Sequence, residues 1–74
     1  MNENIFSARI RQRRRELGLT THELGRRIYI CGDTVGKYER GVMMPRLDTA
    51  FRLADALGVS FAWLVGLDAL PYSR

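Results

Sequence analysis

Apolar residues recur at helical spacing in five segments of the chain, and glycines or prolines separate these segments. This spacing is typical of amphipathic α-helices, whereas the alternation that is typical of strands is weak. The segments cover about residues 5–17, 20–29, 32–40, 46–57 and 60–65. Because each helix is too short to persist alone, the helices must pack together. The pattern therefore predicts an all-α fold, a compact bundle of five helices.

The apolar positions also predict which side chains form the core. In the first helix, Phe6, Ile10 and Leu17 share one face, opposite a set of arginines. The second and third helices turn shorter apolar faces inward. In these two helices the expected core residues are Leu24, Ile28, Val35 and Tyr38. The apolar stripe of the fourth helix consists of Leu47, Ala50, Phe51, Ala54 and Leu57.

Local signals mark the helix ends. Thr20, with Glu23 three residues later, forms a capping box at the start of the second helix. Gly18 is expected in the left-handed conformation that ends the first helix. We expect a single domain over residues 1–66. The tail, residues 67–74, is then a dimer strap, a final turn or a truncation point.

Composition narrows the classes of protein. The chain has 74 residues, 46% of them hydrophobic and 27% charged, which is typical of one globular domain. Cys31 and His22 are the only residues of their types, so a disulfide within the chain and a Cys/His zinc cluster are excluded. No apolar run approaches the length of about 20 residues that spans a bilayer, and the polar start does not resemble a signal peptide. We therefore expect a cytoplasmic protein that binds no metal, no cofactor and no membrane.

The charge is unevenly distributed along the chain. The net charge is +4, and eleven of the twelve basic residues are arginine. Residues 1–40 contain nine basic and five acidic residues, whereas residues 41–74 contain three of each, so all the excess lies in the first three helices. A basic half beside a neutral half is typical of nucleic-acid binding. A solvated helix face is the alternative that charge alone leaves open.

The connection between the second and third helices favours DNA. Only Tyr29–Cys31 join them, which is the length found in DNA-binding helix-turn-helix motifs. In that motif the first helix lies across the DNA backbone and holds the second in the major groove.

Residues 19–41 resemble the phage-repressor and Cro-type helix-turn-helix family, the XRE-like transcriptional regulators. Further resemblances extend the likeness over residues 5–66. They are Arg9–Arg11 with Arg14, Gly18–Thr20, Tyr38–Gly41, Pro45, Leu57–Ser60 and Trp63–Leu64. The resemblance implies a lambda-repressor-like domain and a sequence-specific regulator, expected to be a repressor. It also implies a homodimer on a palindromic operator in double-stranded DNA.

The resemblance also implies roles for single residues. In the recognition helix, Gly32–Arg40, the positions that face base edges are Gly32, Asp33 and Lys37. Thr21 and Arg40 match positions that contact phosphate, and Arg14 and Glu39 match an internal ion pair. From their places on the first two helices we add Arg11 and Arg26 as phosphate candidates. Of the remaining arginines of the first helix, most are expected in solvent.

Four single positions and one loop depart from the family pattern; the loop, Val42–Met44, is apolar where polar or basic residues are usual. Thr21 stands where a glutamine usually contacts phosphate, and Cys31 replaces the usual serine or threonine cap. Tyr29 stands where glycine is usual, so a positive φ there would cost about 1–3 kcal/mol. Gly36 costs roughly 1 kcal/mol in mid-helix relative to alanine.

Two classes of function remain after these observations. Dimer contacts are expected from the fifth helix and the tail. The candidates are Phe61, Trp63, Leu64, Leu67, Leu70 and Tyr72. The alternative function is an antitoxin-like protein-interaction module that uses the Val42–Met44 loop or the tail, and exposure of that loop would favour it. An enzyme is rejected, because one histidine, one cysteine and three serines offer no nucleophile–base pair, and no small-molecule site is evident.

Overall fold

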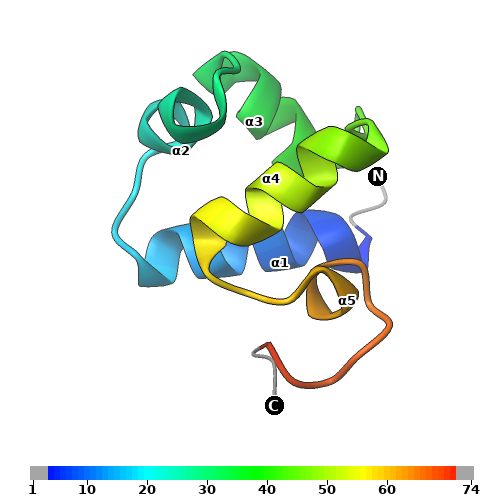
Figure 1. Ribbon diagram of the computed structural model, residues 1–74. Helices are drawn as coiled ribbons and strands as arrows, with labels where there is room; N and C mark the ends of the chain where they lie inside the picture. Colours follow the sequence, from blue (N-terminus) through cyan, green and yellow to red (C-terminus); the bar gives the residue numbers. More distant parts are fainter. Residues whose placement is uncertain (1–3, 72–74) are drawn as a thin grey trace.

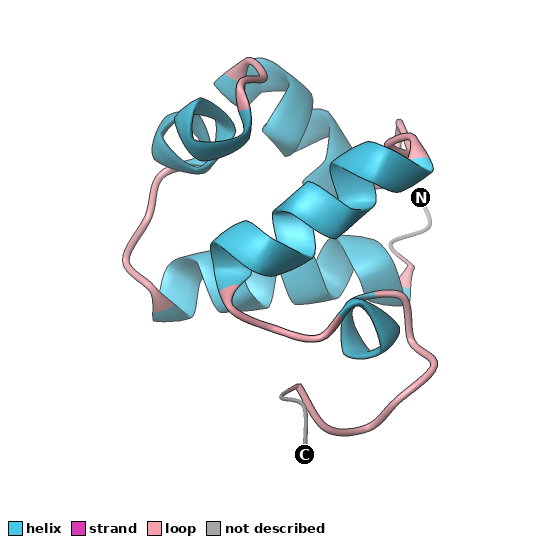
Figure 2. Cartoon of the chain, viewed as in Figure 1, coloured by secondary structure: helices cyan, strands magenta, loops and turns pink. Residues whose placement is uncertain are grey.

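The computed structural model describes residues 4–71, and all regular structure in that range is helical. The helices are α1 (Ile5–Glu16), α2 (Thr21–Ile28), α3 (Gly32–Arg40), α4 (Leu47–Leu57) and α5 (Phe61–Leu64). The five-helix, all-α prediction is confirmed (Figure 2). Helix α4 crosses in front of α1, while α2 and α3 stand together on one side of this crossing and α5 lies on the other (Figure 1).

The core lies where the five helices meet. Its fully buried members come from every helix, and a larger set of nearly buried side chains surrounds them. The fully buried hydrophobic residues are Ile10, Leu24, Val35, Leu53, Leu57 and Leu64. Six nearly buried residues complete the core at exposed fractions of 3–6%: Phe6, Ile28, Tyr38, Ala50, Ala54 and Trp63. Each helix therefore obtains its stability from packing against the others.

Leu17 was wrongly predicted to be a core residue. Helix α1 ends at Glu16, and the chain then turns through Gly18, whose φ is +70°. This turn leaves the Leu17 side chain exposed and brings Leu19 against the core instead.

The predicted stripe of α4 was also partly wrong. Leu53 is fully buried, whereas Leu47 and Phe51 are 64% and 48% exposed. The inner face instead follows Ala50, Leu53, Ala54 and Leu57. Phe51 lies on the flank of the helix and stacks on Phe61 of α5, with ring centroids 4.1 Å apart. The aromatic pair thus draws Phe51 toward α5, away from the centre of the bundle.

Side-chain caps fix the starts of three helices. The Asn4 side-chain oxygen accepts the Ser7 amide at 2.8 Å, and the Ser60 hydroxyl accepts the Trp63 amide at 3.0 Å. At α2 the predicted capping box is present: Thr20 Oγ1 accepts the Glu23 amide at 3.0 Å, and Glu23 Oε1 accepts the Thr20 amide at 2.8 Å. These bonds satisfy amide groups that a helix start leaves without a partner.

The tail folds back on its own chain as far as Pro71. The Pro71 carbonyl accepts the Ser60 amide at 2.7 Å. Arg9 of α1 donates to the Trp63 carbonyl and, at 3.1 Å, to the Asp68 carbonyl. Its guanidinium also lies 4.7 Å from the centre of the Trp63 ring, at cation–π distance. The Leu67 and Asp68 amides also donate to the Ala62 carbonyl, so the tail is attached at several points to α5 and the elements around it.

Candidate nucleic-acid interface

One face of α3 is free for a ligand. Val35, Tyr38 and Glu39 are buried, so they fix which side of the helix packs inward. The opposite stripe runs along positions 33, 36, 37 and 40, at helical spacing. Its residues are Asp33, Gly36, Lys37 and Arg40, and Gly36 contributes no side chain. A helix with its side chains is about 10–12 Å across, which matches a major groove about 12 Å wide.

Gly36 is the one member of this stripe that sequence analysis did not assign to the site. A Cβ at Gly36 would meet only the end of the Arg40 side chain, at 3.1 Å. The position therefore opens a gap in the outer face of α3 between two charged side chains. Its spacing from Asp33 and Lys37 was a signal that could have identified it.

The close contact between α2 and α3 depends on two glycines. A Cβ at Gly25 would lie 2.4 Å from the Ile30 carbonyl oxygen, and a Cβ at Gly32 would lie 2.7 Å from the His22 Cα. Real Cβ atoms essentially never come so close to backbone. Gly32, a predicted base-reading position, is thus explained by helix packing, because its side-chain direction points to α2.

A bidentate ion pair joins α1 to α3. Arg14 Nε lies 2.5 Å from Glu39 Oε2, and Arg14 Nη2 lies 2.9 Å from Glu39 Oε1. Arg14 also donates to the Leu19 carbonyl at 2.8 Å. The pKa of the Arg14 guanidinium is raised, first of all by its hydrogen bond to Glu39. The expected pair is present, and it fixes the position of the recognition helix on the bundle.

Arg11 has a structural partner. Its Nη2 donates to the Glu39 main-chain carbonyl at 2.7 Å, and its Nε lies 3.9 Å from the Glu39 carboxylate. The side chain therefore helps to hold the end of α3. A phosphate contact by Arg11 would have to be made from this bound position.

Other arginines of α1 were wrongly expected in solvent. Arg13 Nε donates to the Leu57 carbonyl at 2.8 Å, and Arg9 holds the tail as described above. With Arg11, they bind main-chain carbonyls at or just beyond the ends of three other helices. Such carbonyls have no partner within their own helix, so a cation there satisfies them.

The remaining candidates lie around a hollow beside α3. Its lining includes Arg11, Thr21, His22, Asp33, Gly36 and Arg40. Arg26 is exposed on α2 outside this hollow, and Lys37 lies on the neighbouring side of α3. The hollow thus brings together candidates from three helices.

The charged groups on α3 have different chemistry. Lys37 Nζ lies 3.8 Å from the Asp33 carboxylate, an exposed pair one helical turn apart. Lysine and arginine donate to guanine edges or phosphate, whereas a carboxylate accepts from the cytosine amino group. Asp33 has the same sign of charge as phosphate, so the charge of this face is not uniformly attractive to an anion.

The turn has unusual backbone geometry, and the start of α3 lacks a side-chain cap. Tyr29 ends α2 at φ +63°, ψ +41°, and among residues 4–71 it is the one non-glycine residue with positive φ. Cys31 caps α3 by position but makes no side-chain hydrogen bond. Tyr29 therefore has the positive φ that was expected to strain the backbone at this position.

The structure divides the dimer candidates. Trp63 and Leu64 are buried in the core of the single chain, so they are removed as interface residues. Leu67 and Leu70 are exposed, and Phe61 is half-buried against Phe51. Tyr72 lies outside the described residues.

Among residues 4–71, no group of three or more His, Cys, Asp and Glu side chains is placed to hold a metal ion. In the same range, every helix is too short or too polar to cross a membrane.

Comparisons with known proteins agree with this geometry. Residues 10–64 match the family model described as helix-turn-helix. An uncharacterized HTH-type transcriptional regulator of Methanothermobacter thermautotrophicus is 45% identical over 49 residues, which are 66% of this chain and 71% of the relative. The transcriptional repressor RstR of the cryptic phage CTXphi, from Vibrio cholerae, is 38% identical over 61 residues, which are 82% of this chain. The match covers 55% of RstR, so the chain spans about half of that relative.

A solved structure gives the same fold. The crystal structure of the P22 c2 repressor in complex with a synthetic operator matches with a TM-score of 0.82 and 26% identity. The match covers 88% of this chain and 98% of that repressor chain.

Proposed function

The chain belongs to the helix-turn-helix family, and on that premise we propose that it is a transcriptional repressor that binds duplex DNA with α3 in the major groove. The observation that carries the proposal is the outer stripe of α3. Asp33, Lys37 and Arg40 stand on an unpacked face, while the Arg14–Glu39 pair and the Gly32 contact hold that helix rigidly. A rigid support for base-reading side chains is what specific recognition requires.

In this proposal Lys37 and Asp33 read base edges, and Gly36 leaves room for a base substituent between them. Arg40, Thr21 and Arg26 contact phosphates. No step of it is catalytic and no cofactor enters. Because its target is DNA, we further propose that the protein acts in the cytoplasm, as a phage-repressor-like regulator does.

We propose a symmetric dimer that places two α3 helices on half-sites about 34 Å apart. Phe61, Leu67 and Leu70 are the interface candidates left by the structure, because they are the ones with accessible apolar surface. Dilution of the protein should reveal a dimer–monomer equilibrium. A monomer at every concentration, with and without DNA, would contradict the symmetric arrangement.

The deciding experiment is a selection from random DNA duplexes, followed by salt titration of the winner against a scrambled duplex. A palindromic winner that retains its preference as salt rises supports the proposal. If binding is weak, shows no preference for a sequence and is lost uniformly as salt rises, the basic face only attracts DNA by its charge and does not read its sequence.

A protein-binding role for the Val42–Met44 loop is the second candidate. Val42, Met43 and Met44 are 62%, 41% and 59% exposed, and clustered apolar residues in solvent indicate a contact surface. Replacing Met43 and Met44 by serine separates the two roles. Loss of operator binding would assign the loop to DNA, whereas unchanged operator binding would leave it for a protein partner.

A further inference from the structure

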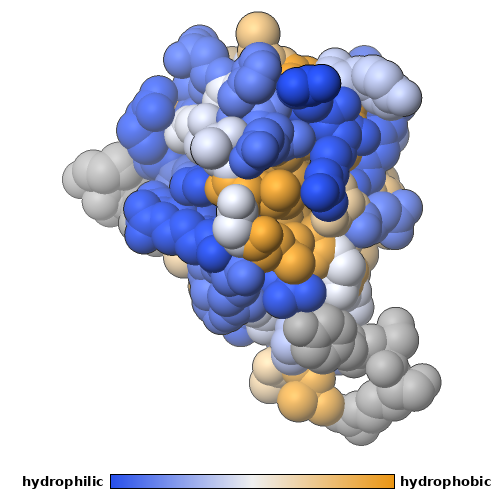
Figure 3. Space-filling model, turned by 90° about the vertical axis from the view of Figure 1, so that its left-hand side faces the viewer, coloured by the Kyte–Doolittle hydropathy of each residue, from blue (hydrophilic) through white to orange (hydrophobic). Residues whose placement is uncertain are grey.

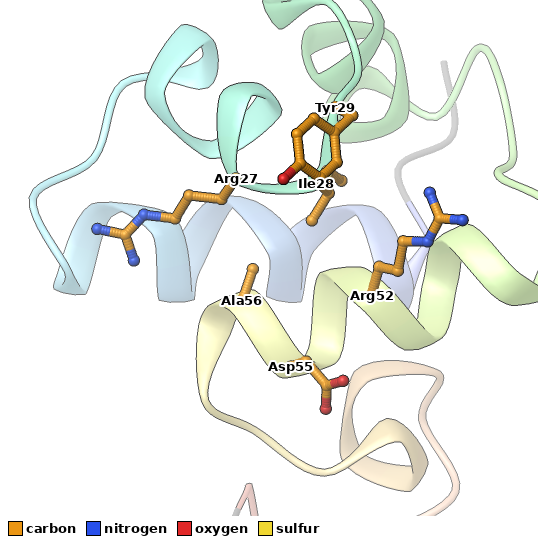
Figure 4. A pocket seen from close by; sticks show the side chains of 6 residues that line it. All are labelled: Arg27, Ile28, Tyr29, Arg52, Asp55 and Ala56. Atoms are coloured by element: carbon orange, nitrogen blue, oxygen red, sulfur yellow. The ribbon is translucent and has the colours of Figure 1, made fainter.

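An open groove lies between the end of α2 and α4, away from the face that carries Lys37. Its lining is Arg27, Ile28, Tyr29, Arg52, Asp55 and Ala56, and its volume is about 470 Å³. Ile28 and Ala56 form an apolar floor between the two helices, below the ring of Tyr29 (Figure 4). On the side of the molecule that includes the end of α4, apolar surface gathers in the middle and hydrophilic side chains surround it (Figure 3).

Tyr29 is the unusual residue of this groove. The residue is 90% exposed, so the ring contributes little to packing, and yet its backbone has the left-handed conformation that favours glycine. A bulky residue in that conformation is an outlier that the surrounding structure must impose. Such outliers cluster at binding and catalytic sites. The folded chain itself therefore gives no reason for a tyrosine here, whereas a ligand that uses the ring does.

The rim of the groove is positively charged. Arg27 and Arg52 stand on either side of Tyr29, while the carboxylate of Asp55 points away toward α5 (Figure 4). Within residues 4–71 neither of these arginines has a carboxylate within ion-pair distance. Their charge is thus available to a ligand, and the complementary ligand is an anion with an apolar part.

We propose that this groove binds an acidic segment of a protein partner. In the proposed complex, a large apolar side chain of the partner lies on Ile28 and Ala56 beneath Tyr29. Carboxylates that flank this side chain pair with Arg27 and Arg52. Tyrosine and arginine are, with tryptophan, enriched among the residues that dominate the binding energy of protein interfaces. Single-stranded nucleic acid fits less well, because it binds to rows of aromatic rings, and the groove offers one ring above an aliphatic floor.

The groove and the DNA-facing hollow have separate linings. None of the six groove residues lines the hollow beside α3. A partner can therefore bind the groove while α3 is occupied, which distinguishes this surface from a DNA-mimic site.

The test is selection of a random twelve-residue peptide library on the protein, in the presence of excess random-sequence duplex DNA to cover the α3 face. Enriched peptides should combine Asp or Glu with a large apolar residue. The affinity of a synthetic winner should fall at least tenfold in Tyr29→Gly and in Arg52→Glu. It should change less than twofold in Arg15→Glu, a matched reversal of an exposed arginine on α1. Tyr29→Gly removes the strained side chain, so a thermal melt of that variant can exclude unfolding as the cause.

Several results would overturn the proposal. These are the absence of enrichment, a winner without acidic residues, and affinity that is unchanged in both groove variants. Displacement of the winner by duplex DNA would place it on the α3 face instead. Tyr29-dependent binding of a single-stranded oligothymidylate that is tighter than the peptide would assign the groove to nucleic acid. The groove variants report on this surface alone, so these outcomes are separate from failure of operator binding.

Discussion

The carboxylate of Glu39 on α3 accepts both hydrogen bonds of a bidentate pair from Arg14 on α1, at 2.5 and 2.9 Å. The Glu39 side chain is 7% exposed and the Arg14 side chain 13%. Arg11 adds a third contact from α1 to the same residue. Helix α3 is thus joined to α1 by charge-assisted hydrogen bonds, which are stronger than neutral ones.

We expect Glu39→Ala to destabilise the fold by about 3 kcal/mol, because it leaves the Arg14 guanidinium buried without its partner. In a domain of this size that corresponds to a fall in melting temperature of roughly 12–24 °C. Urea unfolding measures the free energy. Glu16→Ala is the control, since it removes an exposed pair with Arg13 and should hardly move the midpoint. Equal midpoints for Glu39→Ala and the parent would show that the pair does not stabilise the fold.

Tyr29→Gly should raise the free energy of unfolding by about 1 kcal/mol. Relief of the left-handed backbone gains about 1–3 kcal/mol, and the added freedom of the unfolded chain offsets part of it. Gly18→Ala is the converse control: its φ is +70° and nothing lies within 4 Å of the added Cβ, so only backbone strain changes. That variant should be destabilised. Thermal melts of both variants, compared with the parent, test these two expectations. A Tyr29→Gly variant that is less stable than the parent would mean that the ring packs more than its exposure indicates.

Replacing the two glycines of α3 by alanine should change the free energy of unfolding in opposite directions. Gly36→Ala should stabilise by up to about 1 kcal/mol, because alanine is the better helix former and only the mobile end of Arg40 must move. Gly32→Ala should destabilise, since its Cβ would lie 2.7 Å from the His22 Cα. Denaturant midpoints measured side by side check the pair. If both substitutions raised, or both lowered, the free energy of unfolding, the packing geometry between α2 and α3 would be contradicted.

The features that sequence predicted well are those that residue types signal locally. A threonine three residues before a glutamate specifies a capping box, and the short Tyr29–Cys31 connection with its flanking helices indicates the motif. The Arg14–Glu39 pair followed from resemblance, not from spacing.

The features that sequence missed depend on tertiary geometry. Helix α4 carries apolar residues over a wide arc, so the pattern alone did not show that Leu53 faces inward and Phe51 sideways. Arg9 and Arg13 also bind main-chain carbonyls of distant residues, and a carbonyl has no residue type and so leaves no trace in the sequence. The role of Gly32 required the distance to His22.

Stability should decrease in acid partly through the capping box. The pKa of Glu23 is lowered, mainly because its carboxylate accepts the Thr20 amide, with Arg26 and Arg27 contributing through their charge. A lowered pKa in the folded state means that this contribution is complete above the ordinary glutamate pKa of about 4.3, and is lost as the pH falls through the lower folded value.

The variant Glu23→Gln isolates that charge, because glutamine can still accept the Thr20 amide. It should be less stable than the parent at pH 7, and the difference should shrink as the pH falls below about 4. Thermal melts from pH 2.5 to pH 7 measure this convergence. A constant difference across that range would show that the charge of Glu23 has no part in the cap.

Lys37→Ala should weaken binding to the selected operator by about 1–3 kcal/mol, with an unchanged melting temperature. The loss follows from its place on the outer face of α3. The melting temperature should not change, because the exposed ion pair of Lys37 with Asp33, at 3.8 Å, contributes little to stability. Binding isotherms on the operator and on a scrambled duplex, each at several salt concentrations, measure the effect. Selective loss on the operator identifies Lys37 as a base-reading residue. An equal loss on both duplexes, with a salt slope lower by about one, would instead assign it to phosphate.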